Sequence, residues 1–143
     1  MNDFIHEFEV LIDTFPAELS AINTVAFNEK LVPEKWSKKE ILGHLIDSAM
    51  TNYLRFIRAQ SEENPQIFYA QDDFCENANY QQSETKQLTD LWLSLNKQLL
   101  FLFRTLIARD LTTRKCNDLT LAFLMADYVT HLNHHRHQIL ASL

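Results

Sequence analysis

The sequence predicts an all-α protein, a four-helix bundle with a long crossover between its second and third helices, formed by one domain over residues 1–143. The chain has one glycine and three prolines, far fewer than the turns of a β-sandwich or barrel require. Apolar residues recur every three or four positions in four separate stretches, as on the buried face of a helix. The connection over residues 63–82 is far longer than the roughly two to eight residues usual between antiparallel helices.

The first helix is predicted over residues 4–22, where the apolar residues fall on one helical face. These are Phe4, Phe8, Leu11, Ile12, Phe15, Leu19 and Ile22. Pro16 lies inside this stretch and removes one backbone donor. It therefore predicts either a kink or the first turn of a second segment.

The second helix is predicted to begin after Ser37, in the segment WSKKEI. The Ser37 hydroxyl can accept the amide of Glu40 while the Glu40 carboxylate accepts the amide of Ser37, which is a capping box. Trp36 and Ile41 would complete a hydrophobic staple. We expect this helix to end near Gln60. Its inward residues are predicted to be Ile41, Leu45, Ala49 and Phe56.

The third helix is predicted from Ser83 through Leu106, and the fourth from Thr120 to Ser142. The connection over residues 63–82 is long enough to pass from one end of a bundle to the other. We therefore expect the second and third helices to run parallel, which gives an up-down-down-up order.

Composition and charge exclude several classes of protein. Thirteen Lys and Arg against nineteen Asp and Glu give a net charge of −6, with no basic stripe to bind nucleic acid. Residues 2–10, NDFIHEFEV, do not resemble a signal peptide, and no apolar run is long enough to cross a membrane, so a cytoplasmic location is expected. Cys75 and Cys116 lack metal-ribbon or CxxC spacing and are expected to be free thiols.

Four of the six histidines lie within residues 130–139, THLNHHRHQI. Helical spacing places His135 within the apolar stripe of the fourth helix and His131 at its edge, one turn away, so both imidazoles can reach one ion. His134 points beside them and His137 points away. The stripe itself consists of Leu121, Leu124, Met125, Tyr128, Leu132, Ile139 and Leu143.

A third ligand has to come from another helix, and His44 in EILGHLID is the candidate. Gly43 directly precedes it, and glycine inside a helix costs about 1 kcal/mol relative to alanine, so we expect another group to come close there. A lone histidine is usually hydrogen-bonded or half-exposed, and an HxxxH pair is a weak signal. Burial of His44, His131 and His135 together is costly unless their nitrogens find hydrogen bonds or an ion.

The segments WSKKEILGHLID and YVTHLNHHRHQI resemble the DinB-like superfamily of small metal-binding four-helix proteins, which includes a YfiT-like thiol-transferase branch. They carry the patterns W-S-x-x-E-x-L-x-H-L-x-D and H-x-x-H-H-R. The resemblance implies a mononuclear nickel or zinc site with His44, His131 and His135 as ligands. His137 departs from the family pattern, because many relatives have a small residue there.

Four further residues are candidates around this site. Asp47 and Asp127 lie one turn from His44 and His131, where a carboxylate could accept the second ring N–H of a ligand histidine. Tyr53 and His134 are candidate catalytic donors in the pocket. A solvated helix face is the alternative explanation for both aspartates. Arg136 is expected to reach solvent or a surface carboxylate.

Three neutral imidazoles leave coordination positions open and leave the charge of a divalent ion uncompensated, which favours hydroxide, thiolate or carboxylate. With the resemblance, this predicts a metal-dependent enzyme that transfers a low-molecular-weight thiol to a small electrophile. Hydrolysis by a metal hydroxide is the nearest alternative. A non-catalytic module that binds a metal, a small ligand or a partner during stress is another.

We predict a homodimer formed along helix faces, because ten phenylalanines and two tryptophans are many for the core of a 143-residue bundle. Light scattering at micromolar concentration should give twice the mass of one chain. A monomeric mass would contradict this prediction.

Overall fold

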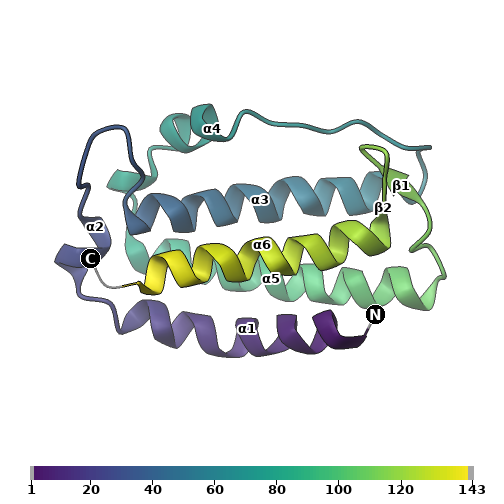
Figure 1. Ribbon diagram of the computed structural model, residues 1–143, viewed down its shortest axis with the longest axis horizontal. Helices are drawn as coiled ribbons and strands as arrows, with labels where there is room; N and C mark the ends of the chain where they lie inside the picture. The colour runs from purple at the N-terminus through teal and green to yellow at the C-terminus, as the bar shows by residue number, and fades with distance from the viewer. Residues whose placement is uncertain (1, 142–143) are drawn as a thin grey trace.

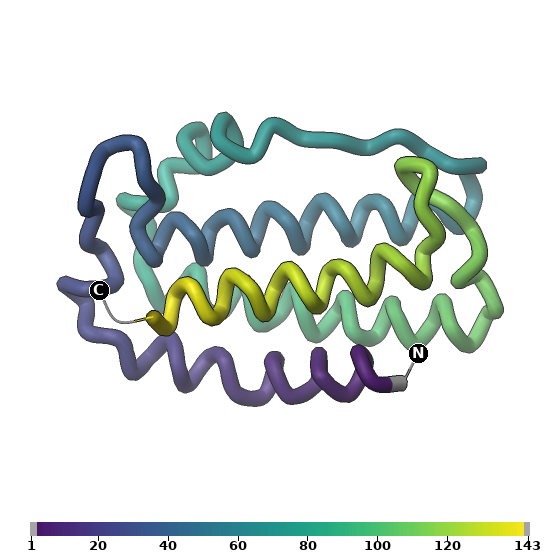
Figure 2. The backbone as a smooth tube through the Cα atoms, in the orientation of Figure 1, coloured from purple at the N-terminus to yellow at the C-terminus, as the bar shows by residue number. Residues whose placement is uncertain are grey.

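The computed structural model describes residues 2–141, and four long helices form its bundle (Figure 1). They are α1 (Asn2–Ser20), α3 (Lys38–Arg58), α5 (Thr85–Ala108) and α6 (Leu121–Leu140). Helices α3 and α5 run in one direction, and α1 and α6 run in the other (Figures 1 and 2). The predicted all-α fold with an up-down-down-up order is therefore confirmed.

The crossover between α3 and α5 is more structured than the sequence predicted. It contains α4 (Gln71–Ala78) and the 3-10 helix η1 (Tyr80–Gln82). Between them, Asn79 adopts a left-handed conformation with φ 56°, which ends α4. Figure 2 shows the crossover returning along α3 to the end of the bundle where α3 begins. The sequence did not reveal α4 because eight residues give too short a periodic signal.

Three other short elements were also not predicted. Helix α2 (Thr24–Asn28) follows α1, and a hairpin of β1 (Lys115–Cys116) and β2 (Leu119–Thr120) connects α5 to α6. The two residues of the hairpin turn, Asn117 and Asp118, both have positive φ, as a tight two-residue turn requires.

The long helices begin and end close to the predicted positions. Helix α1 continues without a break through Pro16, so of the two alternatives at this proline the start of a second segment is excluded. The capping box is confirmed: the Glu40 amide donates to Ser37 Oγ at 3.1 Å, and the Ser37 amide donates to Glu40 Oε1 at 3.0 Å. Helix α5 begins at Thr85 rather than Ser83. The expected end of the last helix at Ser142, and Leu143 of its stripe, lie outside the described residues.

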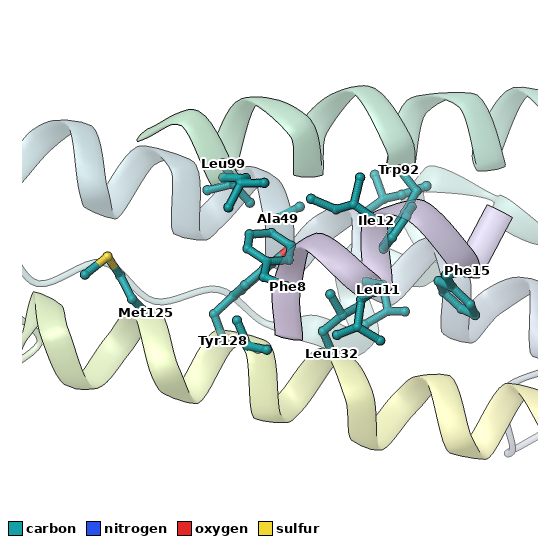
Figure 3. Close-up of a cluster of buried hydrophobic side chains, with 14 of the residues drawn as sticks. Phe8, Leu11, Ile12, Phe15, Ala49, Trp92, Leu99, Met125, Tyr128 and Leu132 are labelled. Atoms are coloured by element: carbon teal, nitrogen blue, oxygen red, sulfur yellow. The ribbon is translucent and has the colours of Figure 1, made fainter. Parts of the chain in front are cut away.

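The core lies along the axis of the bundle and is rich in aromatic side chains. Phe15 of α1 packs edge-on against Trp92 of α5, with ring centroids 5.1 Å apart, and both side chains are fully buried. Figure 3 shows side chains of α1 between those of α5 and α6. The buried Tyr128 hydroxyl donates to Asn96 Oδ1 at 2.5 Å, which satisfies the polar atom of a core tyrosine. No helix among residues 2–141 combines the length and hydropathy needed to span a membrane.

The close approach expected at Gly43 is made by the Tyr80 ring. A Cβ atom added to Gly43 would lie 2.2 Å from Tyr80 Cδ2. The Tyr80 hydroxyl donates to Asp47 Oδ1 at 2.5 Å, one turn further along α3. The missing side chain of Gly43 therefore allows the crossover to lie directly on the turn of α3 that carries His44.

We predict that Gly43→Ala lowers the free energy of unfolding by about 1–3 kcal/mol, because the new methyl group overlaps the Tyr80 ring. In a Tyr80→Ala background, the same substitution should raise it by about 1 kcal/mol, since only the better helix propensity of alanine remains. Urea unfolding of the four proteins in this cycle measures both effects. The same sign in both backgrounds would contradict the close contact.

Candidate metal centre

Three imidazoles from two antiparallel helices converge at one point. His44 comes from α3, and His131 and His135 come from successive turns of α6. The Nε2 atom of His131 lies 3.3 Å from that of His44 and 3.0 Å from that of His135. One ligand atom from each residue lies within 4.8 Å of the others. Residues that are 87 positions apart in the sequence thus form one cluster.

The cluster fits a single transition-metal ion. Tetrahedral coordination with metal–nitrogen distances near 2.0–2.1 Å places neighbouring ligand nitrogens about 3.3 Å apart. The two Nε2 separations of 3.0 and 3.3 Å agree with that spacing. A neutral imidazole has one N–H and one lone pair, so three inward Nε2 atoms cannot all satisfy one another. An all-nitrogen donor set favours zinc or nickel over magnesium or calcium.

Burial keeps these histidines neutral. The side chain of His44 is only 3% exposed, and burial lowers its pKa to about 4, with smaller contributions from the charges of His135 and His131. Burial also lowers the pKa of His131 to about 4, assisted by the charge of His135 and opposed by Asp127. Burial lowers the pKa of His135 in the same direction. At neutral pH their lone pairs are therefore available to an ion.

Gln138 and Trp36 each contact one of the three imidazole rings. His135 Nδ1 lies 2.8 Å from Gln138 Oε1. A histidine that binds through Nε2 carries its proton on Nδ1, so this nitrogen donates to Gln138 and its ring orientation is fixed. The Trp36 ring lies over His44, with centroids 4.9 Å apart. Gln138 was not predicted from the sequence, although its spacing of three from His135 on a helix was a usable signal.

Asp47 is buried beside the cluster, at 2% exposure, but its observed partner belongs to the crossover. Its Oδ1 accepts the Tyr80 hydroxyl, and burial raises the pKa of its carboxyl group, opposed by that hydrogen bond. Within residues 2–141, neither Asp47 Oδ2 nor His44 Nδ1 has a hydrogen-bond partner. The expected bond between Asp47 and His44 is not formed here, and a role for Asp47 in orienting His44 stays a prediction.

The remaining predicted residues lie at different distances from the cluster. Asp127 is exposed, one turn before His131. His134 is also exposed, with its ring centroid 5.1 Å from that of His135, and His137 faces solvent as expected. Tyr53 packs against the hydrophobic core and does not line the cavity beside the cluster. It follows His44 by nine positions, or two and a half helical turns, which places it on the opposite face of α3.

A cavity of about 210 Å³ lies directly beside His44 and His131. Both helices of the cluster line it, and α3 contributes His44, Ser48, Asn52 and Arg55. The crossover contributes Tyr69 and Gln71, whereas Tyr53 is not among the lining residues. The cluster therefore adjoins a space for a small molecule.

A bundle with this helix order and a three-histidine cluster between α3 and α6 defines a class of small metal-binding helical proteins. The sequence matches the DinB superfamily over residues 7–139, and the chain belongs to that family. No curated protein sequence matches it.

The fold is similar to a solved structure described as "YfiT from Bacillus subtilis is a probable metal-dependent hydrolase with an unusual four-helix bundle topology". The TM-score is 0.84 at 22% sequence identity, covering 96% of this chain and 82% of the other. At this identity, the likeness shows the shared fold.

We predict that untagged protein retains about one divalent transition metal per chain, measured by elemental analysis. Alanine at His44, His131 or His135 should weaken metal binding by more than about a hundredfold, since a direct ligand is lost. Gln138→Ala should weaken it by about tenfold, because only the orientation of His135 is lost.

His137→Ala is the matched control, because it removes an exposed imidazole from the same helix. Competition with a chromophoric chelator compares the variants. Equal losses in all of them would contradict the assignment of the inward ligands.

We predict that the metal-free protein loses stability as the pH falls from about 6.5 to about 4. The folded-state pKa values of His44 and His131, about 4, lie below the ordinary value of 6.5, so the unfolded chain binds more protons in this interval. Their contribution to stability is complete above pH 6.5. Urea unfolding at a series of pH values measures the slope, which should be shallower in His44→Gln and unchanged in His137→Gln.

Proposed function

We propose that this protein is a metal-dependent hydrolase of small polar molecules, with His44, His131 and His135 as the ligands of one nickel or zinc ion. The observation that carries the proposal is the convergence of three imidazole nitrogens beside a cavity of about 210 Å³. The description of the similar YfiT structure as a probable metal-dependent hydrolase supports the same class of reaction.

The chain supplies the parts that such a reaction needs around an ion. A divalent ion bound there would polarise a substrate carbonyl and acidify a coordinated water molecule. His44 and His131 stay neutral because they are buried, and Gln138 holds His135 in the orientation that directs Nε2 inward. Asp127 is the carboxylate that lines the cavity, one turn from His131, and it is our candidate to accept a proton from water.

Thiol transfer is the second candidate function. It is favoured by the neutral charge of all three ligands, because the positive charge of the ion then stabilises a bound thiolate. The thiol would have to be a small molecule, since burial raises the pKa of Cys75 to about 11 and neither Cys75 nor Cys116 lines this cavity. A protein that binds metal without turnover is the remaining alternative.

The test is hydrolysis of a panel of small esters and N-acyl amino acids by zinc- and nickel-loaded protein. Hydrolysis should disappear after chelation, return with the metal and fall more than about a hundredfold in His135→Ala, because that substitution removes a ligand. His137→Ala should retain full activity, and circular dichroism checks the folding of both variants.

Hydrolysis that survives chelation would contradict the proposal. Turnover of an electrophile that requires both the metal and an added thiol, without hydrolysis of the panel, would favour thiol transfer. Tight metal binding with no turnover in either assay would favour the non-catalytic module.

A further inference from the structure

The cavity beside the histidine cluster extends along α3 toward a fixed positive charge. His44, Ser48, Asn52 and Arg55 follow one another at spacings of four, four and three, so they lie on one face of the helix. Arg55 lies eleven residues beyond His44, about 16 Å along the helix axis. Its Nη1 atom lies 3.4 Å from Oδ1 of Asn52, which is three positions nearer the cluster. The metal cluster and a guanidinium therefore bound the same cavity.

Arg55 is held in place by backbone rather than by a carboxylate. Its Nε and Nη2 atoms donate to the Ile67 carbonyl of the crossover at 3.0 and 2.8 Å. Asn117 of the hairpin turn holds Ile67 from the other side, with its Oδ1 accepting the Ile67 amide at 2.7 Å and its Nδ2 donating to the Ile67 carbonyl at 3.0 Å. Among the described residues, no ion pair neutralises Arg55. The guanidinium is thus held at a defined position by hydrogen bonds and without an ion pair.

One edge of the guanidinium remains for a ligand. The Nε and Nη2 edge is occupied by Ile67, whereas Nη1 makes only a long contact of 3.4 Å with Asn52 Oδ1. The edge formed by Nη1 and Nη2 can therefore donate two parallel hydrogen bonds, the geometry with which arginine binds a carboxylate.

Asp127, the one carboxylate among the residues that line the cavity, lies toward its metal end. Helix α6 is antiparallel to α3 (Figure 1). Residues that precede His131 in α6 therefore lie beside residues that follow His44 in α3. Asp127, four positions before His131, is therefore level with Ser48, well before Arg55. Asp47 does not line the cavity, and its Oδ1 is occupied by the Tyr80 hydroxyl. Among the residues that line the cavity, Arg55 at the far end is thus the one charged group apart from Asp127 and the histidines.

We propose that the substrate is a small molecule with a carboxylate, which Arg55 binds at the far end of the cavity while the reacting group lies at the histidine cluster. The inference rests on the proposed function, because that function determines which end of the substrate reacts. Arg55 is then a specificity-determining residue. Ser48 and Asn52 line the path between the two ends and present polar atoms to the middle of the substrate.

The test uses cobalt-substituted protein and thiols that anchor one end of a probe at the metal. Mercaptopropionate, mercaptohexanoate and mercaptooctanoate are titrated beside the mercaptoalcohols of the same length, and the sulfur-to-cobalt absorption band reports binding. At the length that reaches Arg55, the carboxylate should bind about tenfold more tightly than the alcohol, since it gains a charge-assisted hydrogen bond.

Arg55→Gln should abolish this carboxylate preference while the alcohols bind as before. Arg55→Lys should retain part of it, because the charge remains without the paired donors. The matched control is Arg58→Gln on the next turn of α3, where the guanidinium pairs with Glu62 at 2.7 Å and does not line the cavity, and it should keep the full preference.

Equal binding of acids and alcohols at every length, or a preference that survives Arg55→Gln, would overturn the inference. A preference lost in Arg55→Gln together with no hydrolysis of any substrate would sustain the carboxylate site and reject the hydrolase proposal. If the protein retained no cobalt at the histidine cluster, the metal site itself would be wrong, and both proposals would fall.

Discussion

The contact between α3 and α6 at His44 and His131 is the constraint on which the rest of the structure depends. Nitrogens from two helices can share one ion only if the helices keep their register along the bundle, because a slip by one residue moves a ligand by 1.5 Å. Lys38, in the first turn of α3, secures this register by donating to the carbonyls of Ile139 and Ala141, at the end of α6. The same bonds satisfy carbonyl groups that the end of a helix leaves free.

Because α3 and α5 are parallel, the chain needs a long crossover between them, and this crossover forms one wall of the cavity. A short loop could not join two parallel neighbours, so the chain has to return along the outside of α3 (Figure 2). Tyr80 fixes one end of that return on Gly43, and Ile67 fixes the other on Arg55. Tyr69 and Gln71, between these anchors, are thereby placed over the polar face of α3. The absence of a side chain at Gly43, which weakens the helix locally, makes this attachment possible.

The helices of the bundle could be predicted from the sequence because their signals are local. Apolar periodicity located all four long helices to within a few residues, and the Ser37 and Glu40 pair marked the start of α3. The shorter elements α2, α4 and the hairpin escaped notice because they are too brief to show a period. Pro16 was ambiguous, since proline removes the same donor whether a helix continues or restarts, and only packing along the whole length of α1 decides between the two.

The sequence by itself determined which face of a helix each histidine occupies, and with it the inward positions of His131 and His135, because helical spacing depends only on position along the chain. It also indicated that a group would approach Gly43. Only the tertiary structure decided that this group is Tyr80, 37 residues further along the chain, and that Arg55 and Tyr69 border the same space as His44. Which residues border a cavity likewise depends on the neighbouring segments, and Tyr53 is not among those that line this one. Contacts between distant segments are set by the packing of the whole chain, and no local pattern encodes them.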